Sequence, residues 1–538
     1  MLFNSYLFIL IFLPLTLFSY YFLVPFLNLK GIKKQQCCLF ILLIASLIFY
    51  GYWNPKYLFL IGTSILFNFS LGLRLHVLTQ SFLKKFLLFL GISFNLALLA
   101  YFKYANFFVD NLEIFLNTSI EWEEIILPIA ISFFTFQQIA YLVDVYNNKT
   151  NEYKLLNYSV FISFFPQLIA GPIVYHSEVK KQYSNLSILK EKYSNFSVGI
   201  CIFILGLFKK VVIADTLEDY STPIFSANED GNIQLVFIEA WIGILAYTFQ
   251  LYFDFSGYSD MAVGLARLFG IRLPFNFNSP FKAINIIDFW KRWHITLSRF
   301  INDYLFTNIA IRFLRFSMKE NLTNFNFLLS IVLPVIITFS LSGLWHGASW
   351  NFLLWGTLHS FFIIICYIWG IFCTNFKIDF SKSFIYRIFS ILLTFFSVTL
   401  AFVPFRTKNM EEAIYFYESL IPSRNILLPN ELVGNWQSLL EKYLNIIPYF
   451  NFDFSGNYIL SAENLQNSTV FIIISFLIVW TLRNSNTFVE IKNNELVFPQ
   501  LERIKINSFG VYLVYLMFFF SLISLTNLNP APYLYFQF

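Results

Sequence analysis

Long apolar stretches recur along the chain, and shorter polar stretches separate them. A helix of about 20 apolar residues crosses the hydrocarbon core of a bilayer. We predict transmembrane helices at residues 5–26, 38–53, 57–73, 87–103, 125–146, 195–214, 235–256, 326–343, 350–372, 386–405, 469–482 and 508–528. The pattern predicts an all-α polytopic membrane protein with about 11–13 transmembrane helices, plus re-entrant and interfacial helices.

The composition excludes an ordinary soluble domain. Of the 538 residues, 57% are hydrophobic, 21% are aromatic and only 12% are charged, so a soluble fold would expose an apolar surface. The first apolar run has no basic leading segment and no small-residue cleavage site, and we expect it to remain as a helix. The five cysteines form no recognisable framework, and we assign them no redox role.

The distribution of basic residues predicts the topology. Lysines follow the first span at residues 30–34, and basic residues follow the third at 74–85, which places both loops in the cytoplasm and the N-terminus outside. The loops at 104–125 and 215–236 carry acidic residues and no Lys or Arg. Loops of that kind fit the outer face.

One apolar segment, residues 158–175, breaks this alternation because lysines flank it on both sides. It contains Pro166 and the pair Gly171-Pro172. Proline interrupts helical hydrogen bonding, and non-helical backbone at membrane depth needs protein or a cavity around it. We therefore predict a re-entrant segment that enters and leaves on the cytoplasmic side.

Two polar stretches interrupt the predicted single membrane domain of residues 1–538. Residues 257–324 are predicted to be a cytoplasmic basic amphipathic segment, because Lys and Arg alternate there with aromatic and aliphatic residues. Such helices bind anionic lipid headgroups, and the same charge also suits the phosphates of a soluble anionic cofactor. Residues 406–468 are predicted to be an extracytoplasmic insertion with a helix from Met410 to Leu420.

Two of the five histidines stand in motifs that suggest chemistry. His294 lies in the stretch 288–298 (DFWKRWHITLS) and His346 in 342–347 (SGLWHG). Neutral imidazole accepts a proton from a hydroxyl near pH 7, so His346 is a candidate general base. The alternative for His346 is a hydrogen bond between helices, and the alternative for His294 is solvation at the interface.

The other histidines receive structural interpretations. We expect His76 and His176 at the surface and His359 in a hydrogen bond within the helix bundle. His346 and His359 would lie on nearly opposite faces of a continuous helix, and no carboxylate or cysteine stands at ligand spacing to either. We therefore predict no metal site. Neither a glycine-rich phosphate loop nor a Gly-x-Ser-x-Gly motif is present.

Five ordered motifs resemble the membrane-bound O-acyltransferase family, in particular its branch for O-acetylation of alginate and peptidoglycan. They are residues 128–137 (PIAISFFTFQ), 165–173 (FPQLIAGPI), 253–262 (FDFSGYSDMA), 288–298 and 345–347 (WHG). The ending 533–538 (YLYFQF) is also similar. One departure follows residues 302–306 (NDYLF), where the family often has a Pro-Leu-Gly-Gly turn and this chain has TNIAIR.

The resemblance implies a ring of tilted helices around a funnel, with His346 as catalytic base and His294 as a supporting residue on the cytoplasmic side. It implies acetyl-CoA as donor, without a metal, and a membrane-anchored or extracytoplasmic transferase as partner. Lys291, Arg292 and Trp293 are then expected to bind the donor. The expected function is O-acetylation of an extracytoplasmic polysaccharide from the bacterial cytoplasmic membrane, with no role for nucleic acid.

Three alternatives remain open at this stage. D-alanyl transfer to teichoic acid belongs to the same family, but the insertion at 406–468 and the two C-terminal spans resemble the acetylating branch more. A transporter would often show inverted repeats, and none is apparent in the sequence. A scaffold that only anchors a surface transferase would not need its histidines.

Overall fold

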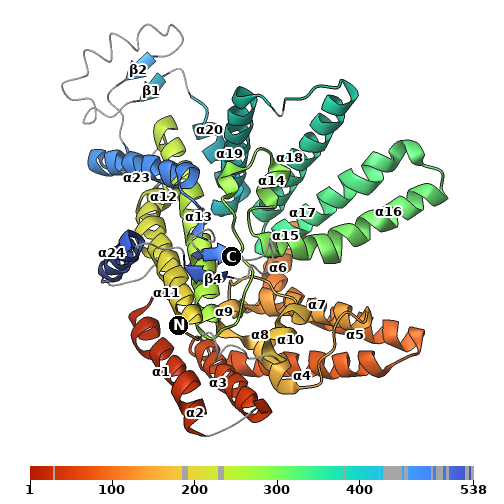
Figure 1. The fold of residues 1–538 in the computed structure, drawn as a ribbon. Coiled ribbons are helices and arrows are strands. Elements are labelled where there is room, and N and C mark those ends of the chain that lie inside the picture. Colours follow the sequence, from red (N-terminus) through yellow and green to blue (C-terminus); the bar gives the residue numbers. More distant parts are fainter. Residues whose placement is uncertain are drawn as a thin grey trace. The chain divides into compact units, whose positions relative to one another are not determined.

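The computed structural model describes residues 1–27, 31–184, 192–227, 235–380, 382–422, 425–427, 451–453, 458–485, 489–491, 501–504, 508–526 and 532–534. These residues are mainly helical (Figure 1). Eight helices among them are long and apolar enough to cross a membrane: 32–51, 56–77, 81–116, 193–226, 328–346, 350–375, 384–406 and 463–481. Two shorter apolar helices cover 7–22 and 510–524. The predicted all-α polytopic fold is confirmed.

The chain divides into two compact units whose segments alternate along the sequence. Unit 1 contains residues 1–211, 255–276 and 484–538, and unit 2 contains 212–254 and 277–483. The helix α13 (Phe237–Leu268) begins in unit 2 and ends in unit 1. That residues 1–538 form a single membrane domain stays a prediction.

Unit 1 holds the N-terminal helices and the C-terminal elements. Its elements are η1 (Leu7–Phe12), α1 (Leu13–Phe18), η2 (Ser19–Leu23), α2 (Val24–Phe26), α3 (Gly31–Gly51), α4 (Lys56–Val77), α5 (Ser81–Leu99), η3 (Ala100–Tyr104), α6 (Ala105–Leu116), α7 (Ile131–Tyr146), α8 (Leu155–Ser163), α9 (Phe165–Leu168), α10 (His176–Ser184), α11 (Lys192–Phe208), the start of η5 (Lys209–Ala214), β3 (Val489–Ile491), β4 (Leu501–Ile504) and α24 (Ser508–Ser524). Strands β3 and β4 are antiparallel.

Buried amides hold the helices of unit 1 together. The Nδ2 atom of Asn95 on α5 donates to Oδ1 of Asn68 on α4 at 2.7 Å, and the reverse bond is 3.2 Å. Gln138 on α7 donates to Ser64 at 2.8 Å. Polar contacts of this kind link helices where packing of apolar side chains gives no preference for protein over lipid.

The predicted re-entrant segment consists of two short helices. Helix α8 has 9 residues and α9 has 4, and each is too short to cross a bilayer. The break falls at Phe164, whose ψ of 108° is not helical. Pro166 then lies in the first turn of α9, where a missing N–H breaks no hydrogen bond within the helix. Residues 158–163 of α8 and all of α9 are buried, which fits the prediction.

Two predictions for unit 1 are wrong. The span expected at 125–146 starts later, since α7 begins at Ile131 after Ala130 turns into the left-handed region at φ 67°. His176 is 1% exposed, not at the surface. Its Nδ1 atom lies 2.8 Å from Oγ1 of Thr150, and its Nε2 atom lies 3.5 Å from Oε2 of Glu152.

Unit 2 carries both motif histidines. Its elements are the end of η5, α12 (Asp215–Ser226), the first part of α13, η6 (Pro280–Lys282), α14 (Ile286–Trp290), α15 (Ile295–Ile301), η7 (Asn302–Phe306), α16 (Thr307–Lys319), η8 (Thr323–Phe325), η9 (Leu328–Val332), α17 (Leu333–His346), α18 (Trp350–Asn375), α19 (Phe384–Arg406), α20 (Met410–Ser419), β1 (Asn425–Leu427), β2 (Asn451–Asp453) and α23 (Ala462–Thr481). Strands β1 and β2 are parallel. Helix α20 confirms the helix expected from Met410.

The basic stretch 257–324 divides into two parts. Residues 257–300 are largely buried, whereas α16 is mostly exposed and alternates Arg312 and Arg315 with apolar residues. The interfacial pattern expected for the whole stretch therefore describes α16 best. Within the predicted insertion 406–468, most of residues 423–457 lie outside the described residues, as does the end of the chain after residue 534.

Candidate active site

His346 stands at the tip of a tightly packed helical hairpin. It is the last residue of α17, and α18 begins at Trp350 and runs beside α17 (Figure 1). A Cβ atom on Gly343 would lie 2.1 Å from the carbonyl oxygen of Phe352, and one on Gly356 would lie 2.2 Å from that of Phe339. The two backbones are thus in direct contact, which only glycine allows.

The imidazole of His346 is packed among aromatic rings. It is 7% exposed, and its centroid lies 4.9 Å from the ring of Trp345, 5.0 Å from Trp355 and 5.4 Å from Phe405. Its position at the C-terminus of α17 places it near the negative end of the helix dipole, which favours a positive charge. If His346 gains a proton during a reaction, the resulting imidazolium is stabilised at this position.

His294 occupies a special backbone position. It is the residue before α15, with φ 44° and ψ 52°, and its side chain is 1% exposed. The left-handed conformation is uncommon for residues other than glycine and is often found at functional sites. Burial lowers the pKa of His294 to about 3, so the imidazole is neutral at physiological pH.

The three predicted donor-binding residues have different environments. Lys291 is exposed, while Arg292 donates from Nε to Oδ1 of Asp288 at 2.9 Å and from a guanidinium nitrogen to the carbonyl oxygen of Asn278 at 3.4 Å. Both Arg292 and Asp288 remain partly exposed. This arrangement holds the guanidinium in one orientation at the surface, as anion binding by arginine requires.

Trp293 belongs to the core of unit 2. It is 6% exposed, and its ring lies 5.1 Å from Phe277, 5.5 Å from Phe289 and 5.7 Å from Phe402. An indole enclosed in this way anchors the neighbouring Lys291 and Arg292 by packing. Its predicted contact with a donor stays a prediction.

Asn351, at the start of α18, links this helix to the end of α19. Its Nδ2 atom donates to the carbonyl oxygen and to Oγ1 of Thr407, at 2.8 and 3.1 Å. These bonds join the start of α18 to the end of α19.

Sequence reasoning missed Trp290 and Trp355, whose buried indole nitrogens have no hydrogen-bond partner within the described structure.

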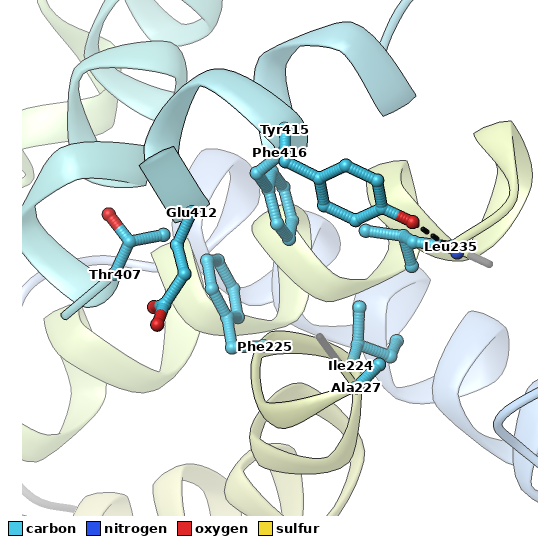
Figure 2. Close-up of a pocket in the computed structure, with 8 residues that line it drawn as sticks. All are labelled: Ile224, Phe225, Ala227, Leu235, Thr407, Glu412, Tyr415 and Phe416. Carbon is cyan, nitrogen blue, oxygen red and sulfur yellow. Dashed lines mark hydrogen bonds between the residues drawn. The ribbon is translucent and has the colours of Figure 1, made fainter. Parts of the chain in front are cut away.

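A small pocket lies beside the end of α19 (Figure 2). It is lined by Ile224, Phe225, Ala227, Leu235, Thr407, Glu412, Tyr415 and Phe416. The Glu412 carboxylate accepts bonds from the backbone of Lys408 and the side chain of Asn409, so it serves the start of α20. The pocket is separated from His346 by a short piece of chain, since Phe405 touches the imidazole and Thr407 lines the pocket.

No group of three or more His, Cys, Asp or Glu side chains gathers like a metal site anywhere in the described part of the chain. The rings that pack against His346 in the described structure are those of Trp345, Trp355 and Phe405. Comparison with known proteins identifies the family of the chain. Residues 86–402, which include both motif histidines, match the model of the membrane-bound O-acyltransferase (MBOAT) family. The chain belongs to this family.

Both acetylating and D-alanylating proteins are similar to this chain, and they support the assignment to the MBOAT family. The chain is 40% identical to the peptidoglycan O-acetyltransferase of Helicobacter pylori, over 80% of this chain and 81% of that protein. It is 32% identical to the "probable alginate O-acetylase" of Pseudomonas putida over 100% of both chains. The teichoic acid D-alanyltransferase of Bacillus subtilis is 30% identical over 44% of this chain and 58% of that protein.

These findings establish a multi-pass membrane enzyme that transfers acyl groups to oxygen. The family assignment favours an enzyme over the transporter and scaffold hypotheses. The roles of His346, His294, Lys291 and Arg292 remain predictions.

Proposed function

We propose that this MBOAT enzyme transfers acetyl groups from cytoplasmic acetyl-CoA toward an extracytoplasmic polysaccharide of the peptidoglycan or alginate type, in the bacterial cytoplasmic membrane. The observation that carries the proposal is the buried His346 at the α17–α18 turn. The relatives of the chain are named peptidoglycan O-acetyltransferase and probable alginate O-acetylase. Teichoic acid D-alanyltransferases match less than half of the chain, which supports acetyl over D-alanyl transfer.

In the proposed reaction, His346 removes the proton from an attacking hydroxyl. The hydroxyl oxygen forms a bond to the carbonyl carbon of the thioester, and the tetrahedral intermediate expels the sulfur. The proton held by His346 passes to the leaving thiolate, so the products are an acetyl ester and a free thiol. Whether a partner transferase or the polysaccharide itself supplies the hydroxyl, the proton transfer is the same.

The donor is proposed to approach through Lys291 and Arg292. Acetyl-CoA carries phosphates, and arginine held by a carboxylate presents a fixed fork of donors to such groups. The Asp288–Arg292 pair supplies this arrangement. His294, buried and neutral two residues further along the chain, is proposed to support the same region of the site.

The proposal is tested with radiolabelled acetyl-CoA and membrane vesicles of known orientation that contain the enzyme and its acceptor. Label should reach a base-labile ester when the cytoplasmic face is exposed to the donor, and not when only the outer face is. Chemical analysis of the labelled polymer separates peptidoglycan from alginate. Transfer from a D-alanyl carrier with none from acetyl-CoA would contradict the proposal.

The donor entrance has its own test. Reversing the charge at Lys291 and Arg292 should raise the apparent KM for acetyl-CoA. The matched control is Lys319→Glu on the exposed α16, where the side chain is 82% exposed. If Lys319→Glu raises this KM as much, or if the double variant leaves it unchanged, the basic residues only contact lipid.

A further inference from the structure

His359 is buried without the hydrogen bond that the sequence led us to expect. It lies on α18 with 0% exposure, and neither ring nitrogen has a hydrogen-bond partner in the described part of the protein. The expected bond within the bundle is therefore wrong. Neutral imidazole has one donor and one acceptor nitrogen. Burying both unpaired is costly, and a phenylalanine would fill the same space without that cost.

Two further unpaired donors surround this imidazole. The rings of Trp290 and Trp355 lie 5.1 and 4.9 Å from that of His359, and 5.8 Å from each other. The Nε1 atoms of both indoles are buried with no hydrogen-bond partner among the described residues. We call these three residues the indole–imidazole cluster. An indole nitrogen can only donate, so the cluster offers three N–H donors.

The cluster adjoins the candidate base. The ring of Trp355 lies 5.0 Å from the ring of His346 and 4.9 Å from the ring of His359. Phe289 and Phe339 stack roughly parallel to the His359 ring, at interplanar angles of 9° and 29°. The imidazole plane is thus fixed, and it lies one ring away from His346.

We propose that the indole–imidazole cluster binds the carbonyl oxygen of the acyl thioester and stabilises the oxyanion. This inference rests on the proposed function, because it assigns the cluster to the reaction of His346. A carbonyl oxygen accepts hydrogen bonds only, which matches a site rich in donors. Neutral histidine in an apolar site is able to polarise a carbonyl as a donor.

The role of the cluster in the reaction follows from charge. When the hydroxyl oxygen bonds to the carbonyl carbon, the carbonyl π electrons move onto oxygen and create a negative charge. Fixed N–H donors surrounded by rings stabilise that charge without reorganisation. When the C–S bond breaks, the electrons return to the carbonyl and the thiolate takes the proton from His346.

The central test replaces His359 by phenylalanine. The kcat for transfer from radiolabelled acetyl-CoA should fall by about 10²–10³, with little change in KM. The thermal midpoint should stay the same or rise, because an unpaired polar group is removed. His359→Gln, which restores an N–H donor, should recover part of the rate. Full activity of His359→Phe would overturn the proposal and leave His359 as a packing residue.

Two further variants keep the test decisive. Phe362→Leu changes packing beside His359, at a centroid distance of 6.2 Å, without removing a donor, and it should keep nearly the parent rate. If His359→Phe does not fold, Trp355→Phe removes one donor and retains a ring. A folded Trp355→Phe protein with the parent kcat would overturn the proposal, and a loss of about tenfold or more with KM unchanged would support it.

The result also separates this inference from the proposed function. Acetate released by mild base from the polymer of expressing cells is measured for the same variants, so the readout does not depend on the donor. If His346→Ala abolishes polymer acetylation and His359→Phe does not, only the cluster assignment fails. If His346→Ala retains acetylation, the assignment of His346 as the base fails, and if cells that express the parent protein yield no base-labile acetate, the proposed function itself fails.

Discussion

The α17–α18 contact predicts that one methyl group on Gly356 will disturb catalysis. In Gly356→Ala, the new Cβ atom would lie 2.2 Å from the carbonyl oxygen of Phe339, whereas ordinary contacts begin at 3.4 Å. The helices must therefore separate by about 1 Å near Trp355 and His346, since a backbone oxygen cannot turn away as a flexible side chain does. Overpacking of this kind costs about 1–3 kcal/mol, partly offset by the higher helix propensity of alanine, about 1 kcal/mol.

Catalysis should respond more strongly than stability to this change. A displacement of about 1 Å in an active site lowers the rate up to about 10²-fold. The free energy of unfolding should fall by only about 0–2 kcal/mol. Acetyl transfer and thermal unfolding are measured on the same detergent-solubilised samples. The matched control is Gly370→Ala on the same helix, where nothing lies within 4 Å of the new Cβ atom. If the two variants behave alike in both assays, the proposed link between the helix contact and the site is wrong.

Three further predictions concern charge, topology and packing. The pKa of His294 is about 3 in the folded protein and its ordinary value is 6.5, so the stability of the fold is fully present above pH 6.5 and is lost as the pH falls. This loss, about 2 kcal/mol at pH 5, should be absent in His294→Gln. An equal acid response of both proteins would refute the assignment of His294 as a buried neutral imidazole. Cysteines placed at the exposed Lys154 and Lys181, in a background without the native cysteines, should both resist an impermeant thiol reagent applied outside, and labelling of only one would show that the segment spans the membrane. His176→Phe should lower the free energy of unfolding by about 1–3 kcal/mol, because Glu152 loses a buried partner, and an unchanged thermal midpoint would contradict this.

Helix length and hydropathy allowed much of the fold to be predicted. The helices at 328–346, 350–375 and 384–406 correspond to predicted spans because each carries a long apolar run with charged or turn residues at its ends. Hydropathy does not distinguish lipid from protein surroundings, however. Residues 257–300 therefore read as an interfacial segment, although most of them are buried in the protein.

The candidate site was less accessible to sequence reasoning because it depends on contacts between distant residues. The motif around His346 was visible, since imidazole is rare in an apolar run. The role of Asn351 depends on Thr407, which is far along the chain. Trp355 and His359 read as ordinary helix residues, and only their burial without hydrogen-bond partners distinguishes them in the described structure.

The most direct test of the account is the His346→Ala variant, with acetyl transfer and thermal unfolding measured on the same purified preparation. Loss of a general base typically lowers the rate by about 10²–10⁴, whereas loss of a hydrogen bond between membrane helices costs only about 0.6–2 kcal/mol. The account predicts a folded protein with a nearly unchanged thermal midpoint and at least about a hundredfold loss of transfer. A destabilised variant that transfers acetyl groups at nearly the parent rate would contradict it.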